Sequence, residues 1–256
     1  MMKNAFITGA ASGIGRATAE TLYAQGWSLG LADINEQALK EMTLGWDEQR
    51  VHCYALDVTK PEQCAAVIGE FAAQHDKQLR LLFNSAGILQ IDRFEDVSSQ
   101  RHQQIFDINV MGTIHCCQAA FPYLRHTSGA QVINMSSASA TYGIPRLASY
   151  SASKFAISGL TEALELEWEE YGIRVCDVMP PFVSTPMLNE QASGAPVLDK
   201  LGVHLNAEDV ARTILQQIEQ PKTHRAVSLQ FALTYAASQL LPRAVTRAII
   251  RLLNKG

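Results

Sequence analysis

The chain has 256 residues, of which 47% are hydrophobic and 18% are charged, as in a globular protein with a substantial core. Its formal net charge of −4 argues against a nucleic-acid-binding protein, because such proteins usually carry a basic surplus. The five cysteines form no C-x-x-C pair, and the seven histidines show no metal-ligand spacing. We therefore expect free thiols and no metal site.

The start of the chain bears on localisation. A strand pattern begins almost at once, which leaves no room for a secretory signal peptide. No uncharged apolar run reaches the roughly 18 residues that a membrane-spanning helix needs. These features predict a cytoplasmic protein.

Short apolar runs alternate with longer stretches of helical periodicity. In chain order, the pattern predicts strand Ala5–Thr8, helix Ile14–Gln25, strand Ser28–Asp33, helix Glu36–Met42, strand Val51–Leu56, helix Glu62–Gln74, strand Leu79–Phe83, a long helix within Ser98–Arg125, strand Gln131–Met135, helix Tyr150–Tyr171, strand Ile173–Met179, helix Ala207–Gln217 and a short last strand Ala226–Leu229.

This alternation predicts an α/β fold. We expect one doubly wound parallel sheet of about seven strands, with helices on both faces, in a single domain. Right-handed crossovers bring the carboxyl ends of the strands to one edge, where ligands bind. We assign residues 1–229 to this domain, including a substrate loop at about 185–206. Residues 230–256 form a helical, basic and amphipathic C-terminal extension in this interpretation.

A glycine-rich turn joins the first predicted strand to the first predicted helix. Gly9, Gly13 and Gly15 allow a tight turn and a close approach of the backbone to a pyrophosphate. The free N–H groups at the start of the helix attract phosphate. A plain strand-to-helix turn is the alternative, but the position after the first strand favours dinucleotide binding.

Asp33 ends the second predicted strand, where an acidic residue can accept hydrogen bonds from the adenosine ribose of NAD. Its carboxylate would also repel the 2′-phosphate of NADP. Neither Ser12 nor the residue after Asp33 is basic. The sequence therefore favours NAD over NADP, with a helix-capping aspartate as the alternative.

Four further motifs follow in order. They are Asn84-Ser85-Ala86-Gly87 after the fourth strand, Asn109-Val110-Met111-Gly112 in the long helix, Ser136-Ser137 after the fifth strand, and Tyr150-Ser151-Ala152-Ser153-Lys154. With the Gly-x-x-x-Gly-x-Gly spacing of the first turn, they resemble the short-chain dehydrogenase/reductase family from residue 4 to about 190. The resemblance implies a Rossmann-like oxidoreductase that moves a hydride between NAD and an alcohol or carbonyl group.

Tyr150 and Lys154 lie four residues apart, hence on one helix face. A free phenol has a pKa of about 10, and a nearby ammonium lowers it by stabilising the phenolate. Tyr150 can then act as the acid or base, while Ser137 donates a hydrogen bond to the substrate oxygen. The resemblance further implies that Lys154 binds the nicotinamide ribose and that Asn109 helps to hold a water-linked proton path to Lys154.

Two residues compete for these roles. Tyr142 is followed four residues later by Arg146, whose guanidinium cannot give up a proton, and Ser136 adjoins Ser137. The spacing of thirteen residues between Ser137 and Tyr150 in the family selects the latter pair.

The resemblance also implies further cofactor contacts, and the sequence departs from the family pattern at one of them. Pro180-Pro181 stands where the family usually has Pro-Gly, and because proline fixes φ and lacks an N–H, we expect an altered nicotinamide pocket. The remaining contacts implied are Ser12 and Ile14 in the first turn, Asp57 and Val58 near the adenine, Asn84, Ala86 and Gly87 near the ribose and backbone, and Pro180, Val183 and Thr185 near the nicotinamide.

The apolar content of the loop from Thr185 to about Asn206 indicates an apolar alcohol or ketone, or simple packing on the domain. After Glu219 the chain has no acid. The last stretch carries Arg243, Arg247, Arg251 and Lys255 on one helix face, which fits an anionic membrane surface. Packing on another subunit or over the substrate mouth is the favoured alternative.

The family resemblance implies a homodimer or homotetramer that pairs through helices around 100–125 and 150–171. The alternatives to an NAD-dependent dehydrogenase are an NADPH-dependent carbonyl reductase, a relative with lyase or isomerase chemistry, and a non-catalytic dinucleotide-sensing protein. The complete set Asn109, Ser137, Tyr150 and Lys154 favours the enzyme over the sensor.

Overall fold

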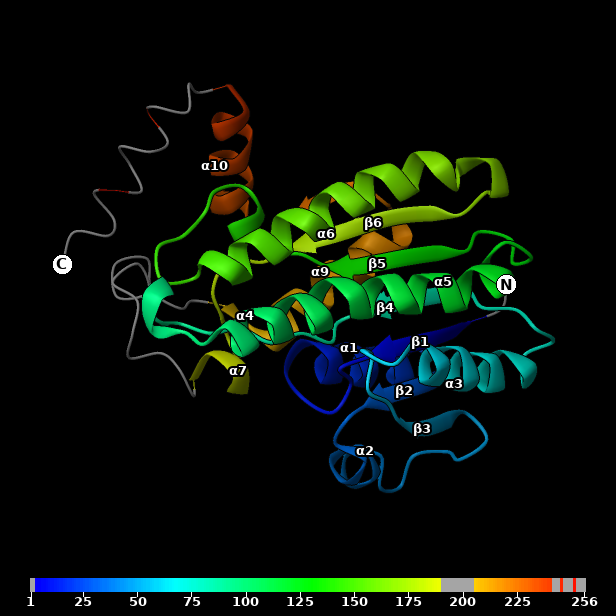
Figure 1. Cartoon of the computed structure of the whole chain (residues 1–256). Helices are drawn as coiled ribbons and strands as arrows, with labels where there is room; N and C mark the ends of the chain where they lie inside the picture. Colours follow the sequence, from blue (N-terminus) through cyan, green and yellow to red (C-terminus); the bar gives the residue numbers. More distant parts are fainter. Residues whose placement is uncertain (1–2, 190–204, 241–244, 246–250, 252–256) are drawn as a thin grey trace.

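The fold is described by a computed structural model that covers residues 3–189, 205–240, 245 and 251. Within these residues, seven parallel strands form the central sheet in the order β3-β2-β1-β4-β5-β6-β9 (Figure 1). Two short strands, β7 (Val183–Ser184) and β8 (Leu205–Asn206), pair separately. The seven strands are β1 (Asn4–Thr8), β2 (Ser28–Asp33), β3 (Val51–Ala55), β4 (Leu81–Asn84), β5 (Gln131–Met135), β6 (Arg174–Met179) and β9 (His224–Ala226).

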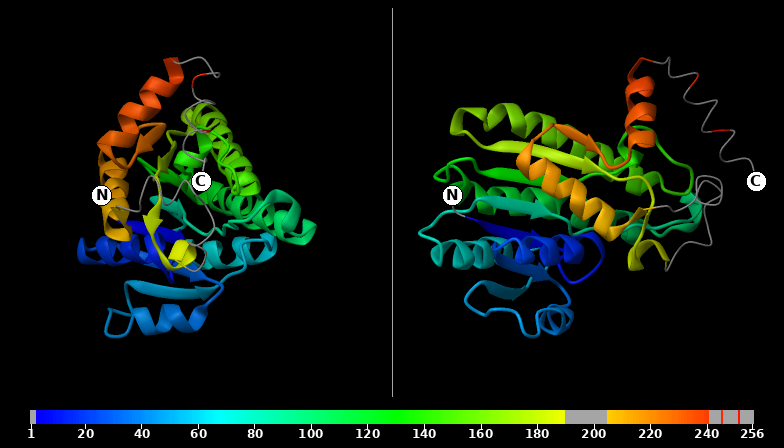
Figure 2. Two further views of the ribbon diagram at one scale, coloured as in Figure 1. Left: turned by 90° about the vertical axis from the view of Figure 1, so that its left-hand side faces the viewer. Right: turned by 180° about the vertical axis from the view of Figure 1, so that it is seen from behind.

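Helices cover both faces of this sheet, as Figures 1 and 2 show. The described helices are α1 (Gly13–Ala24), α2 (Glu36–Met42), α3 (Pro61–Ala73), α4 (Ser99–Phe106), α5 (Gly112–Leu124), α6 (Ala148–Glu167), α7 (Pro186–Asn189), α9 (Ala207–Glu219) and α10 (Leu229–Leu240). On one face α1 packs against α9, where Leu22 and Ile214 are buried. On the other face α3 packs against α5, where Phe71 and Leu124 are buried.

This arrangement confirms the predicted doubly wound, Rossmann-like sheet. The chain adds β2 and β3 on one side of β1, then crosses over to add β4, β5 and β6 on the other side. The order of the strands therefore reverses between β1 and β4. All carboxyl ends of the parallel strands lie at the left-hand edge in Figure 1, so the switch point places a ligand-binding crevice there.

Most elements agree with the prediction to within two residues at each end, and three differ by more than that or in kind. The last strand of the sheet is His224–Ala226 rather than Ala226–Leu229, and Leu229 begins α10. The predicted long helix is interrupted by a π-helical turn at Asp107–Met111. The helix predicted at Tyr150–Tyr171 begins at Ala148 and ends at Glu167, before a short 3₁₀ turn. The polar start of the last strand and the π turn both depend on tertiary contacts described below.

Much of the predicted substrate loop and C-terminal extension lies outside the described residues. This applies to 190–204 of the loop, and to Arg243, Arg247 and Lys255 of the basic face. The described residues of the extension show that α10 runs to Leu240 and that Arg251 is exposed. No helix in the described ranges is both long and apolar enough to cross a membrane.

The turn between β1 and α1 lies in close contact with the backbone after β4. Gly9 has a φ of +65°, and a Cβ atom on it would lie 2.7 Å from Cα of Ala86. Thr8 reinforces the contact, because its Oγ1 accepts hydrogen bonds of 3.2 Å from the N–H groups of both Ser85 and Ala86. Glycine at position 9 thus allows two neighbouring strand ends to meet.

We expect Gly9→Ala to destabilise the protein more than Gly26→Ala does. Gly26 also has a positive φ, +84°, but nothing lies within 4 Å of a Cβ atom there. The control should cost roughly 1–2 kcal/mol of unfolding free energy for the left-handed conformation alone. The collision at Gly9 should add about 1–3 kcal/mol. Urea denaturation measures both losses, and equal losses would contradict a tight contact at Gly9.

Candidate functional site

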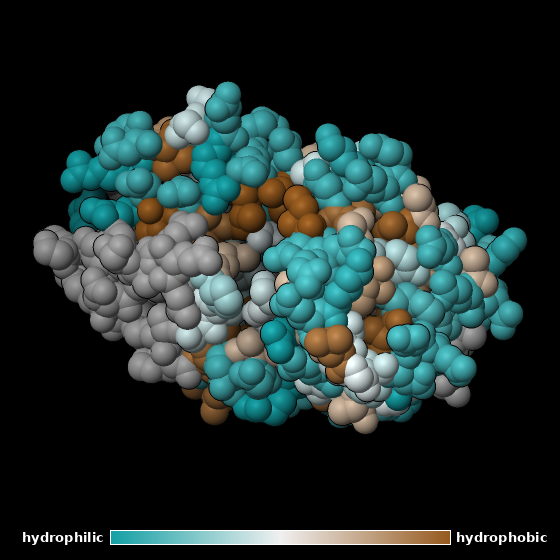
Figure 3. Space-filling model, turned by 90° about the horizontal axis from the view of Figure 1, so that it is seen from below, coloured by the Kyte–Doolittle hydropathy of each residue, from teal (hydrophilic) through white to brown (hydrophobic). Residues whose placement is uncertain are grey.

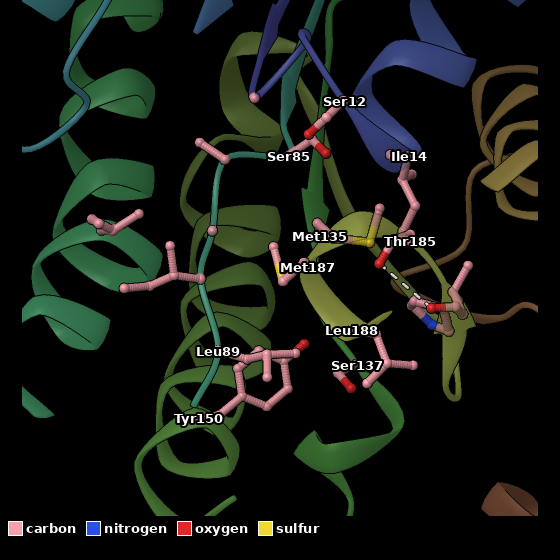
Figure 4. Close-up of a pocket in the computed structure, with 18 of the residues that line it drawn as sticks. Ser12, Ile14, Ser85, Leu89, Met135, Ser137, Tyr150, Thr185, Met187 and Leu188 are labelled. Carbon is pink, nitrogen blue, oxygen red and sulfur yellow. Dashed lines mark hydrogen bonds between the residues drawn. The ribbon is translucent and has the colours of Figure 1, made fainter. Parts of the chain in front are cut away.

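A pocket of about 300 Å³ lies at the edge where the strands of the large sheet end. Figure 4 shows Ser12 and Ser85 at one end of it, and Tyr150 and Ser137 at the other. The predicted site residues that line it are Gly9, Ser12, Gly13, Ile14, Asp33, Asp57, Val58, Ala86, Gly87, Ser137, Tyr150, Lys154, Pro180, Val183 and Thr185. Gly15, Asn84 and Asn109 are not in its lining and support it from behind.

The N-terminus of α1 forms one end of the pocket. Ser12 is the N-cap residue, but no side chain caps the helix, so its first N–H groups keep their capacity to bind an anion. Gly13 has a φ of +52° beside the Thr185 side chain, and a Cβ atom on Gly15 would lie within 2.8 Å of the Gly9 carbonyl carbon. These features of the turn fit a pyrophosphate.

Asp33 holds the next part of the pocket wall. Its Oδ2 accepts a hydrogen bond of 3.0 Å from the Ala11 N–H, and its Oδ1 accepts one of 2.9 Å from the Asn35 N–H. Asn35, and not Asp33, caps α2. The helix-capping alternative for Asp33 is therefore wrong. Ile34, 77% exposed, lies beside it in the pocket lining and offers an apolar surface.

Asp57 and Val58 lie at the same end, after β3. The Asp57 Oδ1 accepts hydrogen bonds from the N–H and the hydroxyl of Thr59, at 2.9 and 2.7 Å. Val58 is buried, and a Cβ atom on Gly112 would approach its side chain to 2.6 Å. The glycine of the Asn-x-x-Gly motif thus lets α5 pack against this wall of the pocket.

Tyr150, Lys154 and Ser137 come together at the other end of the pocket. Tyr150 and Lys154 lie on one face of α6, and the Lys154 Nζ is 5.5 Å from the centroid of the Tyr150 ring. The Lys154 Nζ donates a hydrogen bond of 2.8 Å to the carbonyl of Met135. Ser137 follows β5 and lines the pocket together with Tyr150.

The two ionisable groups are both shifted towards their neutral forms. Burial raises the pKa of Tyr150 to about 12, and the Ser137 side chain only partly opposes this. Burial lowers the pKa of Lys154 to about 8, opposed by the charge of Asp177. We expected the ammonium to lower the tyrosine pKa. Among the protein groups alone, desolvation outweighs that effect, because it penalises a phenolate in an apolar site.

Asn109 lies in the π turn and holds the segment that follows β4. Its Oδ1 accepts a hydrogen bond of 2.8 Å from the Ile88 N–H, and its Nδ2 donates to the Ile88 carbonyl at 2.9 Å and to Ser153 Oγ at 3.1 Å. A π turn inserts one residue, which explains how Asn109 faces both segments. The side chain therefore fixes the wall of the pocket next to Lys154.

Asn84 is buried behind the ribose end of the pocket. Its Nδ2 donates to Asn134 Oδ1 at 2.9 Å, while its own Oδ1 has no partner among the described residues. Ser136 Oγ is likewise buried without a described partner, and Ser136 lines the pocket. Such orphaned polar atoms are uncommon inside proteins, so they fit a site that receives a polar ligand.

The segment after β6 forms the wall that faces Ser137. The Pro180 carbonyl accepts a hydrogen bond of 2.9 Å from the Ala138 N–H, which ties this segment to the one that carries Ser137. Pro181 also lines the pocket, so the departure from Pro-Gly lies in the site itself. Val183 pairs with Leu205 across β7 and β8, which anchors the start of the substrate loop.

Sequence reasoning missed an apolar group around Tyr150. Leu89, Ile91, Leu147 and Leu188 are buried together, and Tyr150 packs against them. Figure 4 shows Leu89 beside the Tyr150 ring and Leu188 near Ser137. Leu89 and Ile91 follow the Asn-x-Ala-Gly motif directly, at the carboxyl end of β4, which was the available signal.

Comparisons with known proteins agree with this geometry. The family model described as short chain dehydrogenase matches residues 3–195. A cyclohexanol dehydrogenase from Acinetobacter sp. (strain SE19) is 32% identical over 219 residues, which cover 83% of this chain and 86% of the relative.

Two solved structures are also similar. A short-chain dehydrogenase/reductase from Burkholderia phymatum in complex with NAD has a TM-score of 0.81 at 27% identity, covering 92% of each chain. ElxO with NADP bound has a TM-score of 0.78 at 22% identity, covering 89% of this chain and 97% of that one, and shows the fold alone. This chain belongs to the short-chain dehydrogenase/reductase family of oxidoreductases.

Proposed function

We propose that this protein is an NAD-dependent dehydrogenase of an apolar secondary alcohol, or a reductase of the corresponding ketone. The carrying observation is that the Tyr150 hydroxyl shares the pocket with Ser137, while the Tyr150 ring packs against an apolar group of side chains. Such a site recognises one oxygen atom on an otherwise apolar molecule. The net reaction converts the alcohol and NAD⁺ to the ketone, NADH and a proton.

Each residue has one task in this reaction. Bound NAD would supply the hydride acceptor for the carbinol carbon and a positive charge that favours the Tyr150 phenolate. Tyr150 takes the hydroxyl proton, and Ser137 donates a hydrogen bond to the substrate oxygen as its charge changes. Lys154 holds the nicotinamide ribose and, as an ammonium, favours the phenolate.

Asn109 acts indirectly, without contacting the reacting atoms. Its hydrogen bonds to Ile88 and Ser153 hold the backbone beside Lys154, where a water-linked proton path would run.

The proposed nucleotide contacts extend from this centre to the start of α1. Gly9, Ser12, Gly13, Ile14 and Gly15 would hold the pyrophosphate. Asp33 would accept hydrogen bonds from the adenosine ribose, and its charge favours NAD over NADP, in keeping with its place in the pocket wall. The remaining contacts proposed are Asp57 and Val58 near the adenine, Asn84, Ala86 and Gly87 near the ribose, and Pro180, Val183 and Thr185 near the nicotinamide.

The substrate class is supported by the pocket wall and by one relative. Leu89, Leu147 and Leu188 offer apolar surface and no hydrogen-bonding side chain next to Tyr150. A polyol would leave hydroxyl groups unpaired there, at a cost that a hydrocarbon ring does not incur. Cyclohexanol, on which the Acinetobacter relative is named to act, is therefore the first substrate to test.

We further propose a cytoplasmic homodimer or homotetramer. Met111, Phe155 and Leu166 are exposed on or beside α5 and α6. Apolar side chains exposed on a helix pair often mark a subunit interface. Most of the surface seen in Figure 3 is hydrophilic, with hydrophobic residues gathered in part of it. Membrane contact through the basic C-terminal helix remains a separate proposal that rests on sequence alone.

Tyr150→Phe should lower kcat for cyclohexanol by about 10²-fold or more, because it removes the acid–base hydroxyl and keeps the ring. NADH affinity should be retained. Tyr142→Phe is the matched control, since it removes another phenol from the same region without touching the site, and its kcat should match the unsubstituted protein. Steady-state kinetics and nicotinamide fluorescence measure these effects. Equal turnover by both variants would contradict the role of Tyr150, whereas NADH binding without turnover in the unsubstituted protein would favour the non-catalytic sensor.

NADH should bind more tightly than NADPH, and Asp33→Asn should reduce that preference by about tenfold, equivalent to roughly 1.4 kcal/mol. The substitution removes a charge that repels the 2′-phosphate and weakens an acceptor for the ribose. Asp57→Asn removes a negative charge from the same edge of the sheet and should change both affinities alike. Fluorescence titration with each nucleotide measures the ratio. Tighter binding of NADPH to the unsubstituted protein would contradict the role of Asp33.

A further inference from the structure

A row of polar side chains crosses the sheet beneath α6. Thr8, Asn84, Asn134, Asp177 and His224 are register partners on the successive strands β1, β4, β5, β6 and β9. Register partners of neighbouring parallel strands point to the same face. Asn134 shows which face it is, because its Nδ2 donates a hydrogen bond of 3.0 Å to Thr161 Oγ1 of α6. The row therefore lies under the helix that carries Tyr150 and Lys154.

The outer end of this row is an ionic cluster. Asp177 is fully buried, and its Oδ2 lies 2.9 Å from His224 Nδ1. The other ring nitrogen, Nε2, lies 2.9 Å from Glu162 Oε1 of α6. An ionised carboxylate only accepts hydrogen bonds, so both ring nitrogens of His224 must carry a proton to satisfy both contacts. The imidazole is thus held as a cation between two carboxylates.

The cluster spans the distance from the interior to the surface. The Asp177 side chain is 0% exposed, that of His224 is 13% exposed, and that of Glu162 is 63% exposed. Asp177 Oδ1 has no hydrogen-bond partner among the described residues. Half of a buried carboxylate is therefore without a hydrogen bond, an expensive arrangement for a residue that merely fills space.

Asp177 acts on Lys154 through its charge. Both lie on the same side of the sheet, where the Lys154 Nζ binds the carbonyl of Met135, the residue after Asn134. The negative charge of Asp177 favours the ammonium of Lys154, against the burial that lowers its pKa to about 8. Burial raises the pKa of Asp177 itself, while the hydrogen bond from His224 and the charge of Lys154 lower it.

We propose that Asp177, held ionised by His224 and Glu162, is a positioning residue that keeps Lys154 protonated in the nucleotide site. Glu162 holds His224 in place at the surface, and His224 supplies the cation that a buried carboxylate needs. The ionised Asp177 in turn stabilises the ammonium form of Lys154. The effect on turnover rests on the proposed function, whereas the effect on Lys154 does not.

Other titratable groups face the cluster. Hydrogen bonding to Asp177, with lesser effects of charge and of Glu162, raises the pKa of His224 to about 9, so the imidazole stays charged at neutral pH. Tyr235 of α10 feels the charges of Asp177 and Glu162, and burial raises its pKa, so it stays neutral. Burial raises the pKa of Cys176, next to Asp177, to about 12.

The first test measures the protonation of Lys154 itself. The pKa of Lys154 follows from a ¹³C NMR titration of lysine-labelled full-length protein, with the signal assigned by its loss in Lys154→Met. Asp177→Asn should lower this pKa by about one unit or more, because an opposite charge has been removed from a buried ammonium. Glu165→Gln is the matched control. It removes a carboxylate that pairs with Arg174 at the other end of α6, and should leave the pKa unchanged.

A second variant keeps the proposal testable if Asp177→Asn does not fold. Asp177→Asn with His224→Gln replaces the buried ion pair by two amides that can still bind each other, and it should lower the Lys154 pKa as the single substitution does. A cluster that only ties β9 to α6 would lower the melting temperature and leave the Lys154 pKa in place. An unchanged Lys154 pKa in either folded variant overturns the proposal.

The pH dependence of NADH affinity provides the functional readout. NADH affinity should fall as the pH rises through the Lys154 pKa. In Asp177→Asn the fall should occur about one pH unit lower, which is a tenfold loss of NADH affinity at a fixed pH above the Lys154 pKa. A shifted Lys154 pKa without any NADH binding would leave the cluster's role intact and contradict the proposed function instead. A shifted Lys154 pKa with an unmoved affinity profile would overturn the link between the cluster and the nucleotide.

Discussion

The close approach of the turn after β1 to the backbone after β4 is the constraint on which the site depends. Gly9 lies so near Ala86 that a single methyl group would separate them. Because the strand order reverses between these two strands, this contact closes the bottom of the crevice and aligns the start of α1 with the segment that leads to Leu89. The pocket residues from Ser12 to Tyr150 are therefore positioned relative to the contact between Gly9 and Ala86.

The apolar side chains at the catalytic end of the pocket have an electrostatic cost. Burial pushes the Tyr150 and Lys154 pKa values in opposite directions, so that desolvation works against the phenolate and against the ammonium. An efficient acid–base pair near neutral pH therefore needs charge from outside the pair. The negative charge of Asp177 favours the ammonium of Lys154, and a bound NAD would favour the phenolate of Tyr150. The chemistry and the nucleotide site are coupled for this reason.

The features that could be predicted from the sequence are those that a local residue pattern determines. Parallel strands such as β2 carry a short buried run, here Leu29 to Ala32, and the glycine turn and the Tyr150–Lys154 spacing can each be recognised within one segment. The π turn at Asp107–Met111 could not be predicted in this way, because it depends on Asn109 reaching Ile88, 21 residues earlier. The apolar group around Tyr150 was missed for the same reason: Leu89, Leu147 and Leu188 belong to three separate segments.

The last strand, β9, was predicted two residues too late, and the reason again lies in a contact between distant segments. His224 and Arg225 are polar, so an apolar pattern places the strand two residues too late, at Ala226. In the fold, His224 belongs to the sheet because Asp177 lies beside it on the neighbouring strand and binds its ring. A polar residue that breaks the strand pattern is thus explained by a buried charge, and in our proposal that charge favours the ammonium of Lys154. In our proposal, His224, which the local pattern excluded from the sheet, therefore links the edge of the sheet to the catalytic end of the pocket through Asp177.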